Sequence, residues 1–443
     1  MLPVLIAILS MTVLGLPITL AIDRSARGPL LLGTAFLYGS GLVFLAMLAL
    51  SILHIPWSTL SIALAALPPV VALWVFRTQH PALSTQHLRF HWLDIPTLIS
   101  MIGFTLFATV APLWEWDFWA IWGMKARVFL ERGGIDWRFL ESRWNAYVHP
   151  DYPLLVPLNF DFVALLNGGW SDRWLGLVSV AWALALLLIV RDLASREASV
   201  VPAALITLSL TGLAASRYPG LAEGPVIAFG AAGVLFVRRA LAAEDGGGPA
   251  GETPALHYWR HAALLLGFAT NVKNEGVALL ASVVLALLLI RPRAVARLWP
   301  AFLLAAPWLI LRAAHTLQTD IVSGSAISRV LYRLPYAADI LMFVARKLYE
   351  PWFWATVLAG VLIVPVAMRR REAFVLLVTL IQVVFYVGSY FATPHDLRWH
   401  VATSWSRLTD QIAIPITFAV FLMLAQYAAR VEESPDAEAR PVE

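Results

Sequence analysis

The chain has 443 residues, of which 60% are hydrophobic and 14% charged, and it contains no cysteine. Soluble domains carry about 25% charged residues, so the composition excludes an ordinary soluble protein. The absence of cysteine excludes disulfides and thiolate metal sites, and the formal net charge of +4 is modest. We therefore expect an all-α polytopic membrane protein, with no nucleic-acid partner.

Long apolar runs separated by short polar breaks recur along the chain, and each crossing of a bilayer needs about 20 apolar residues. The first run is expected to be a retained helix because no basic residue precedes it. The runs predict thirteen spans: 2–22, 30–53, 59–76, 95–113, 173–190, 199–215, 221–237, 259–274, 276–290, 298–313, 352–368, 373–391 and 411–428. A disordered cytoplasmic tail is expected over 429–443.

The orientation follows from lysine and arginine in the short loops, which favour the cytoplasmic side. Basic clusters such as Arg238-Arg239 and Arg369–Arg371 mark that side. Successive loops must alternate between the two sides of the membrane. The basic clusters all fall on the cytoplasmic side only if the apolar segment Leu154–Asn167 does not cross fully, so we predict a re-entrant or interfacial helix there. The long loop over 114–172 then lies on the outer face.

An aromatic stretch, Trp114–Trp122, opens this outer loop with four tryptophans and two carboxylates. Tryptophan is enriched where a protein meets the membrane–water boundary. The three-residue spacing of Trp116, Trp119 and Trp122 predicts an interfacial helix. One interpretation is that this helix only anchors the chain at the membrane surface and has no catalytic role. Asp117 favours a functional site, because a carboxylate among aromatic rings is partly desolvated and suits general-base work. The neighbouring Glu115 is the second candidate base.

Two further motifs supply acids on the same predicted face. His149-Pro150-Asp151-Tyr152-Pro153 ends the loop, and its prolines fix the backbone. It is either a rigid turn into the membrane or a source of metal ligands or substrate contacts through His149 and Asp151. Glu223 begins a later span, where it either caps the helix or serves a site.

Basic residues complete the candidate site. Lys273 and Glu275 lie between two apolar runs with almost no room for a solvated loop, and ionisable groups at that depth tend to be functional. Lys273 is suited to a phosphate, and Arg407 could bind a phosphate through two parallel hydrogen bonds unless it simply extends to the lipid surface. The other predicted substrate contacts are His400, Lys125, Trp119 and Trp122.

In their order, these motifs resemble the GT-C superfamily of membrane glycosyltransferases, which includes the protein O-mannosyltransferases and the lipid A aminoarabinose transferase. The resemblance is carried by Trp116–Trp122, His149–Leu155, Lys273–Gly276 and the stretch from Trp399-His400 to Arg407. It covers about 95 to 410. It implies a catalytic domain over 95–428, with its outer loop over 114–172. The expected extra transmembrane helices over 1–94 and the expected lack of a large soluble C-terminal domain depart from the superfamily pattern.

The resemblance also implies roles. Asp117 matches the catalytic acid of the first outer loop, Lys273 the lysine that contacts the donor phosphate, and Glu223 the acid of the metal or acceptor site. His149 and Asp151 match the motif before the partial span. A divalent metal, Mg²⁺ or Mn²⁺, held by His149, Asp151 or Glu223 is the one cofactor expected, and no organic cofactor.

The expected function is an inverting transfer of a sugar from a polyprenyl-phosphate donor to a hydroxyl of a glycan, lipid or protein. The expected location is the bacterial cytoplasmic membrane, with the active site facing the periplasm or exterior and membrane lipids as partners. One alternative is a transporter or flippase of lipid-linked sugars, for which inverted repeats and broken charged helices would be expected. The other is a non-catalytic subunit that binds lipid phosphate.

Overall fold

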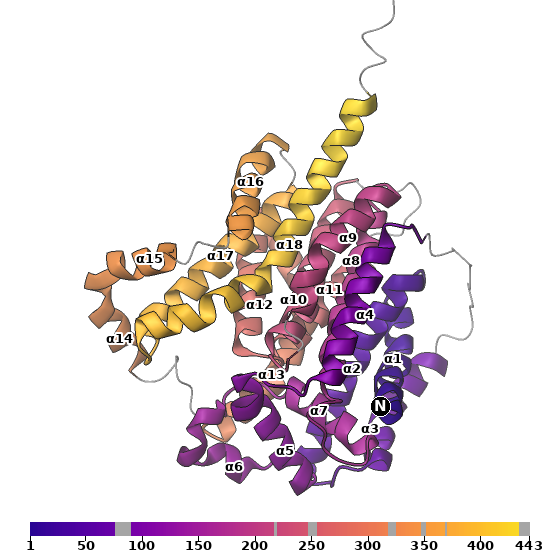
Figure 1. The fold of residues 1–443 in the computed structure, drawn as a ribbon, viewed down its shortest axis with the longest axis vertical. Coiled ribbons are helices and arrows are strands. Elements are labelled where there is room, and N and C mark those ends of the chain that lie inside the picture. Colours follow the sequence, from indigo (N-terminus) through magenta and orange to yellow (C-terminus); the bar gives the residue numbers. More distant parts are fainter. Residues whose placement is uncertain are drawn as a thin grey trace, which may run out of the picture.

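The computed structural model describes residues 1–75, 90–216, 219–246, 255–317, 325–346, 351–367 and 370–433, which contain helices and no strand. Figure 1 shows them as one bundle, with short outer helices at its lower end. The helices are α1 (Leu2–Ile22), α2 (Gly28–Ile52), α3 (Thr59–Val75), α4 (Asp94–Val110), η1 (Phe118–Trp122), α5 (Gly123–Arg132), α6 (Trp137–Glu141), η2 (Arg143–Val148), α7 (Leu155–Leu166), α8 (Gly176–Ser195), α9 (Val200–Ala215), α10 (Glu223–Glu244), α11 (Leu256–Ala269), α12 (Asn274–Ile290), η3 (Pro292–Leu298), α13 (Trp299–Ala314), α14 (Ala326–Arg333), η4 (Leu334–Tyr336), α15 (Ala337–Arg346), α16 (Pro351–Ala367), α17 (Arg370–Ala392) and α18 (Leu397–Glu433).

Each of the thirteen predicted apolar segments coincides with a helix. Among the described residues, seven helical segments are long and apolar enough to cross a membrane. They are Leu2–Ile22, Gly28–Ile52, Gly176–Ser195, Glu223–Glu244, Pro292–Ala314, Arg370–Ala392 and Leu397–Val431. The chain is thus an all-α, multi-pass membrane protein.

The last helix differs most from its predicted limits. α18 begins at Leu397, well before the predicted span at 411. Residues 397–410 are polar enough to interrupt the apolar pattern, but they are helical and extend the span at its N-terminal end. At its other end it includes residues 429–433 of the predicted tail, while 434–443 lie outside the described residues. Arg407 is therefore a helical residue rather than part of a loop.

The centre of the bundle is α10, which packs against α8, α9, α11, α12, α17 and α18. Every residue from Glu223 to Ala242 is buried, and Figure 1 shows this helix in the middle of the bundle. A helix rises 1.5 Å per residue, so Glu223 and Arg238 lie about 22 Å apart along α10. Charged networks form at both of these positions.

The predicted re-entrant or interfacial segment is α7, a helix of 12 residues. At 1.5 Å per residue it is about 18 Å long, whereas the hydrocarbon core of a bilayer is about 30 Å thick. Its residues from Leu155 to Ala164 are buried, and it packs against α1, α2 and α5. Its length and burial favour the re-entrant alternative over a helix on the membrane surface.

Candidate active site

Five charged side chains from four segments form one network, which we call the outer network: Asp117, Glu223, Lys273, Glu275 and Arg407. Arg407 donates through Nη2 to Asp117 Oδ2 and to Glu223 Oε1, the latter at 2.7 Å, and through Nε to Glu223 Oε1 at 3.0 Å. Lys273 Nζ lies 2.8 Å from Glu223 Oε1 and 2.9 Å from Glu275 Oε1. Glu223 is therefore the shared acceptor of both cations.

Two glycines let these segments approach one another. Gly220 has φ of 105°, and a Cβ there would lie 2.8 Å from Phe118 Cβ, so the turn before Glu223 packs directly on the residue after Asp117. At Gly276, a Cβ would lie 2.0 Å from the carbonyl oxygen of Ala269. The start of α12 is thus pressed against the end of α11, which holds Lys273 inside the bundle.

A second cluster surrounds the His149–Pro153 motif. Lys125 is fully buried, and its Nζ donates to the His149 carbonyl at 2.6 Å. Asp151 accepts from Asn274 Nδ2 at 2.7 Å, beside Lys273. Burial lowers the pKa of Lys125 to about 7, against the attraction of Asp151, and burial raises the pKa of Asp151.

The aromatic stretch does not present its tryptophans on one face. Phe118–Trp122 form a π-helical turn, η1, followed by α5. Trp116 is 77% exposed and Trp119 is 48% exposed, whereas Trp122 is fully buried and stacks on Tyr152 at 5.4 Å. The wider turn shifts the register that the three-residue spacing predicted. Trp114, Trp116 and Trp119 are thus accessible to a lipid or sugar, and Trp122 is not.

Two other predicted residues lie beside the network. His400 is half-buried on α18, packs edge-on against Tyr390 at 5.1 Å, and lies within electrostatic reach of Lys273. Glu115 accepts backbone hydrogen bonds from Phe118 and Trp119 through its carbonyl. Its carboxylate takes no part in the outer network, which leaves Asp117 as the better placed base.

The predicted metal ligands do not converge. Glu223 belongs to the outer network, Asp151 is bound to Asn274, and the His149 ring stacks on Tyr152 at 4.7 Å. Within the described part of the chain, no three His, Asp or Glu side chains are grouped as metal ligands. These residues as arranged do not form a three-ligand site, and the metal stays a prediction.

Sequence reasoning missed several residues that complete the site. Asn274 fixes Asp151, Tyr152 lies with its ring 5.8 Å from Lys273 Nζ, and Trp308 donates to the Asp151 carbonyl at 3.2 Å. Asn274 follows Lys273 in the same motif and could have been included. Trp308 could not, because only the fold brings α13 to this loop.

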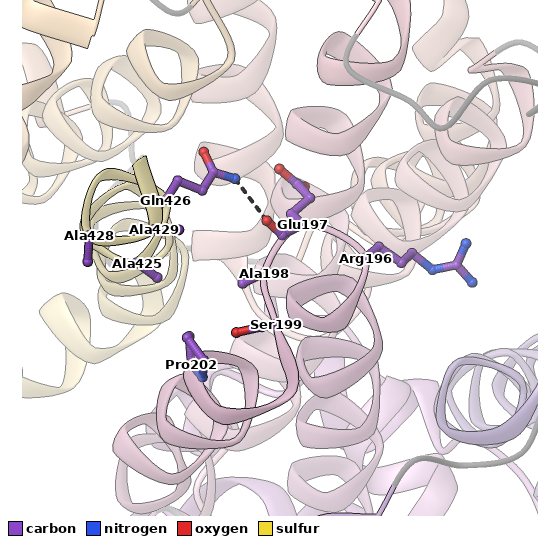
Figure 2. A pocket seen from close by; sticks show the side chains of 9 residues that line it. All are labelled: Arg196, Glu197, Ala198, Ser199, Pro202, Ala425, Gln426, Ala428 and Ala429. Atoms are coloured by element: carbon purple, nitrogen blue, oxygen red, sulfur yellow. Dashed lines mark hydrogen bonds between the residues drawn. The ribbon is translucent and has the colours of Figure 1, made fainter. Parts of the chain in front are cut away.

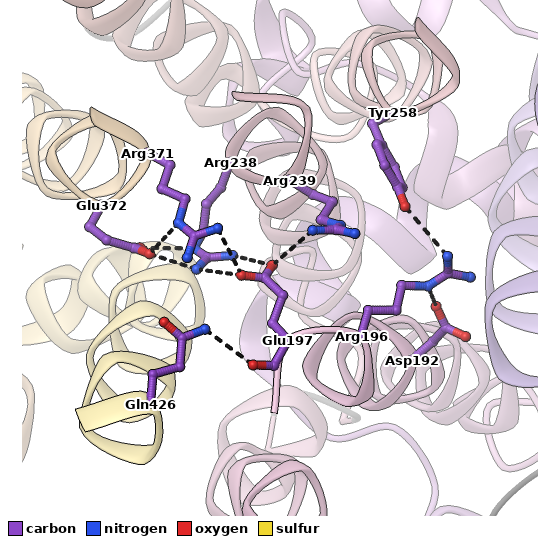
Figure 3. Close-up of polar contacts among 9 residues, drawn as sticks. All are labelled: Asp192, Arg196, Glu197, Arg238, Arg239, Tyr258, Arg371, Glu372 and Gln426. Atoms are coloured by element: carbon purple, nitrogen blue, oxygen red, sulfur yellow. Dashed lines mark hydrogen bonds and ion pairs between the residues drawn. The ribbon is translucent and has the colours of Figure 1, made fainter. Parts of the chain in front are cut away.

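Another charged network, the inner network, lies near the opposite end of α10 (Figure 3). Arg238 donates to Glu197 at 2.7 Å and to Glu372 at 2.6 Å, and Arg371 contacts both carboxylates. These residues come from loops predicted to share the cytoplasmic face, and the structure brings them together.

A cavity of about 420 Å³ adjoins the inner network, between the α8–α9 turn and the end of α18 (Figure 2). Its walls include Ser199, Pro202 and alanines of α18, and Gln426 donates to the Glu197 carbonyl at 3.2 Å. In Figure 2, Arg196 points away from those alanines. Four of its nine lining residues, Arg196, Glu197, Ser199 and Gln426, are polar, and the cavity is remote from the outer network.

Comparison with protein-family models, curated protein sequences and solved structures finds no match to this chain. The functional argument therefore depends on the residues and their geometry.

Proposed function

We propose that the protein is an inverting glycosyltransferase that moves a sugar from a polyprenyl-phosphate donor to an acceptor hydroxyl. The proposal includes a GT-C-like arrangement of thirteen spans in a bacterial cytoplasmic membrane, with the outer network facing the periplasm or exterior. The acceptor is a glycan, a lipid or a protein. The observation that carries the proposal is the convergence of Asp117, Glu223, Lys273 and Arg407.

The chemistry needs a base on one side of the anomeric carbon and positive charge on the other. Asp117 takes the proton of the acceptor hydroxyl as its oxygen bonds to the anomeric carbon, while the bond from that carbon to the phosphate oxygen breaks. Lys273 and Arg407 stabilise the negative charge of the departing polyprenyl phosphate. Losing one such contact typically costs about 10²–10³ in rate.

Both cations of the outer network are engaged with carboxylates. Arg407 is hydrogen-bonded to Asp117, so its guanidinium occupies an oxygen of the proposed base. A donor phosphate would compete for Arg407 and release that oxygen. Donor binding thus prepares the base for the acceptor.

The substrate also needs hydroxyl contacts. Asp151 Oδ1, Glu223 Oε2 and Glu275 Oε2 are buried oxygens without a hydrogen-bond partner among the described residues. Buried polar atoms are normally paired, and sugar hydroxyls are suitable donors. The exposed rings of Trp116 and Trp119 are suited to the prenyl chain or to stacking on sugar. A divalent metal, if bound near Glu223, would polarise the phosphate.

The test is glycosyl transfer in proteoliposomes that contain synthetic polyprenyl-phosphate sugars. Asp117→Asn should abolish transfer and still bind polyprenyl phosphate, while Glu115→Gln, the matched neighbour, should keep transfer. Equal rates for Asp117→Asn and the wild type would refute the assignment of the base. Movement of labelled lipid without transfer would favour the flippase, and binding without transfer or movement would favour a lipid-phosphate-binding subunit.

A further inference from the structure

Polar side chains form three hydrogen bonds at one-turn intervals along α17, inside membrane-spanning helices. We call them the inner, middle and outer rungs. They are Ser282 Oγ to Gln382 Oε1 at 2.6 Å, Tyr386 hydroxyl to Gln411 Oε1 at 3.1 Å, and Tyr390 hydroxyl with Ser404 Oγ at 2.9 Å. The inner rung joins α17 to α12, and the other two join α17 to α18.

The middle rung is connected to the outer network through α18. Tyr386 is 3% exposed, and its hydroxyl faces both Gln411 and Gln382. Gln411 follows Arg407 by one turn of α18, so both side chains emerge from one face of that helix. Ser404 of the outer rung precedes Arg407 by three residues, so the outer rung also meets α18 within one turn of Arg407.

Stability alone is a weak reason for this rung. Hydrogen bonds between transmembrane helices contribute little net stability, whereas polar groups buried in such helices are costly and tend to be functional. The amide nitrogen of Gln411 also has no hydrogen-bond partner among the described residues. An apolar pair would join the two helices without that cost.

We propose that Tyr386 and Gln411 are positioning residues that fix α18 against α17 so that Arg407 reaches both Asp117 and Glu223. The kinetic part of this inference rests on the proposed function. The structural part is independent of the proposed function, because it concerns only the position of the Arg407 guanidinium.

The first measurement is the rate at which phenylglyoxal modifies Arg407 in lipid nanodiscs, followed by mass spectrometry. Tyr386→Phe removes one hydroxyl and keeps the ring. It should raise the rate about fivefold, the effect of losing one buried hydrogen bond. Gln411→Met provides a second variant with the same expectation. The matched control is Tyr38→Phe, which removes a buried tyrosine hydroxyl that lies 2.6 Å from His261 Nδ1 and joins α2 to α11, and which should leave the rate unchanged.

The second measurement is transfer from the polyprenyl-phosphate sugar. Tyr386→Phe should lower kcat about tenfold more than Tyr38→Phe at equal melting temperature, because the middle rung positions the phosphate-binding arginine. Equal modification rates in Tyr386→Phe, Gln411→Met and the Tyr38→Phe control would overturn the inference. Faster modification of Arg407 with no transfer by the wild type would support the inference and refute the proposed function.

Discussion

Replacing Lys273 with methionine tests the outer network most directly. Lys273 is buried and is shared by Glu223 and Glu275, at 2.8 Å and 2.9 Å. The five side chains carry three negative and two positive charges, a net charge of −1, and the substitution changes this to −2. Three carboxylates would then face the single guanidinium of Arg407.

The magnitude follows from the burial of these groups. Removing one partner of a buried ion pair costs about 3–5 kcal/mol because the other charge is left uncompensated. Arg407 still holds Glu223, and the Glu275 side chain is 19% exposed, which places the expected loss near the lower limit, about 3 kcal/mol. Adding Glu275→Gln restores the net charge of −1 and should recover part of that loss.

Denaturant unfolding in mixed micelles, followed by tryptophan fluorescence, measures this change. The matched control is Arg127→Met, which removes an exposed cation whose Nε lies 3.5 Å from Glu131. An exposed pair of this kind contributes about 0.5 kcal/mol or less. The reasoning would be refuted if Lys273→Met unfolded like Arg127→Met, or if Glu275→Gln destabilised the double variant further.

Three other outcomes are expected. Burial lowers the pKa of Lys125 to about 7 in the folded protein, whereas the unfolded chain has the ordinary lysine pKa of about 10.4. The contribution of Lys125 to stability is therefore fully present above the unfolded pKa and is lost as the pH falls toward 7. Stability should therefore rise by up to about 3 kcal/mol between pH 7 and 9, and Lys125→Met should remove that rise in an unfolding series. Arg407→Lys keeps the charge but loses the forked geometry, so kcat for transfer should fall about 10²-fold. Glu372→Gln should lower the free energy of unfolding by about 3 kcal/mol while transfer per folded molecule stays unchanged, and a loss of transfer would contradict the remote location of the inner network.

The sequence was sufficient to predict the apolar helices and that the charged motifs share one face. Apolar runs coincide with helices because each must satisfy its backbone hydrogen bonds within the segment. The assignment of faces from basic loops anticipated that Asp117, Glu223, Lys273 and Arg407 share one side. Their mutual hydrogen bonds depend on close packing between segments far apart in the chain, so no spacing could supply them.

Local sequence patterns were less informative for residues that can be either buried or exposed. Lys125, a predicted substrate contact, lies two residues from the exposed Arg127. The π-helical turn of η1 and the packing of α5 on α7 instead bury Lys125 against Trp122 and Tyr152. Its role as a substrate contact stays a prediction, and in the free protein it supports the His149 turn.

The two charged networks at the ends of α10 differ in access, which explains why the outer one is the better candidate for chemistry. In the inner network the side chains of Arg238, Glu197 and Glu372 are 1%, 4% and 0% exposed, and their charges are paired with one another and with Arg371. In the outer network, Asp117 and Arg407 are 17% and 22% exposed beside exposed tryptophans. Because both groups remain accessible, Arg407 can release Asp117 and bind the donor phosphate, and Asp117 can then bind the acceptor hydroxyl. Glu223, which is fully buried behind them, keeps Arg407 and Lys273 in place during that exchange.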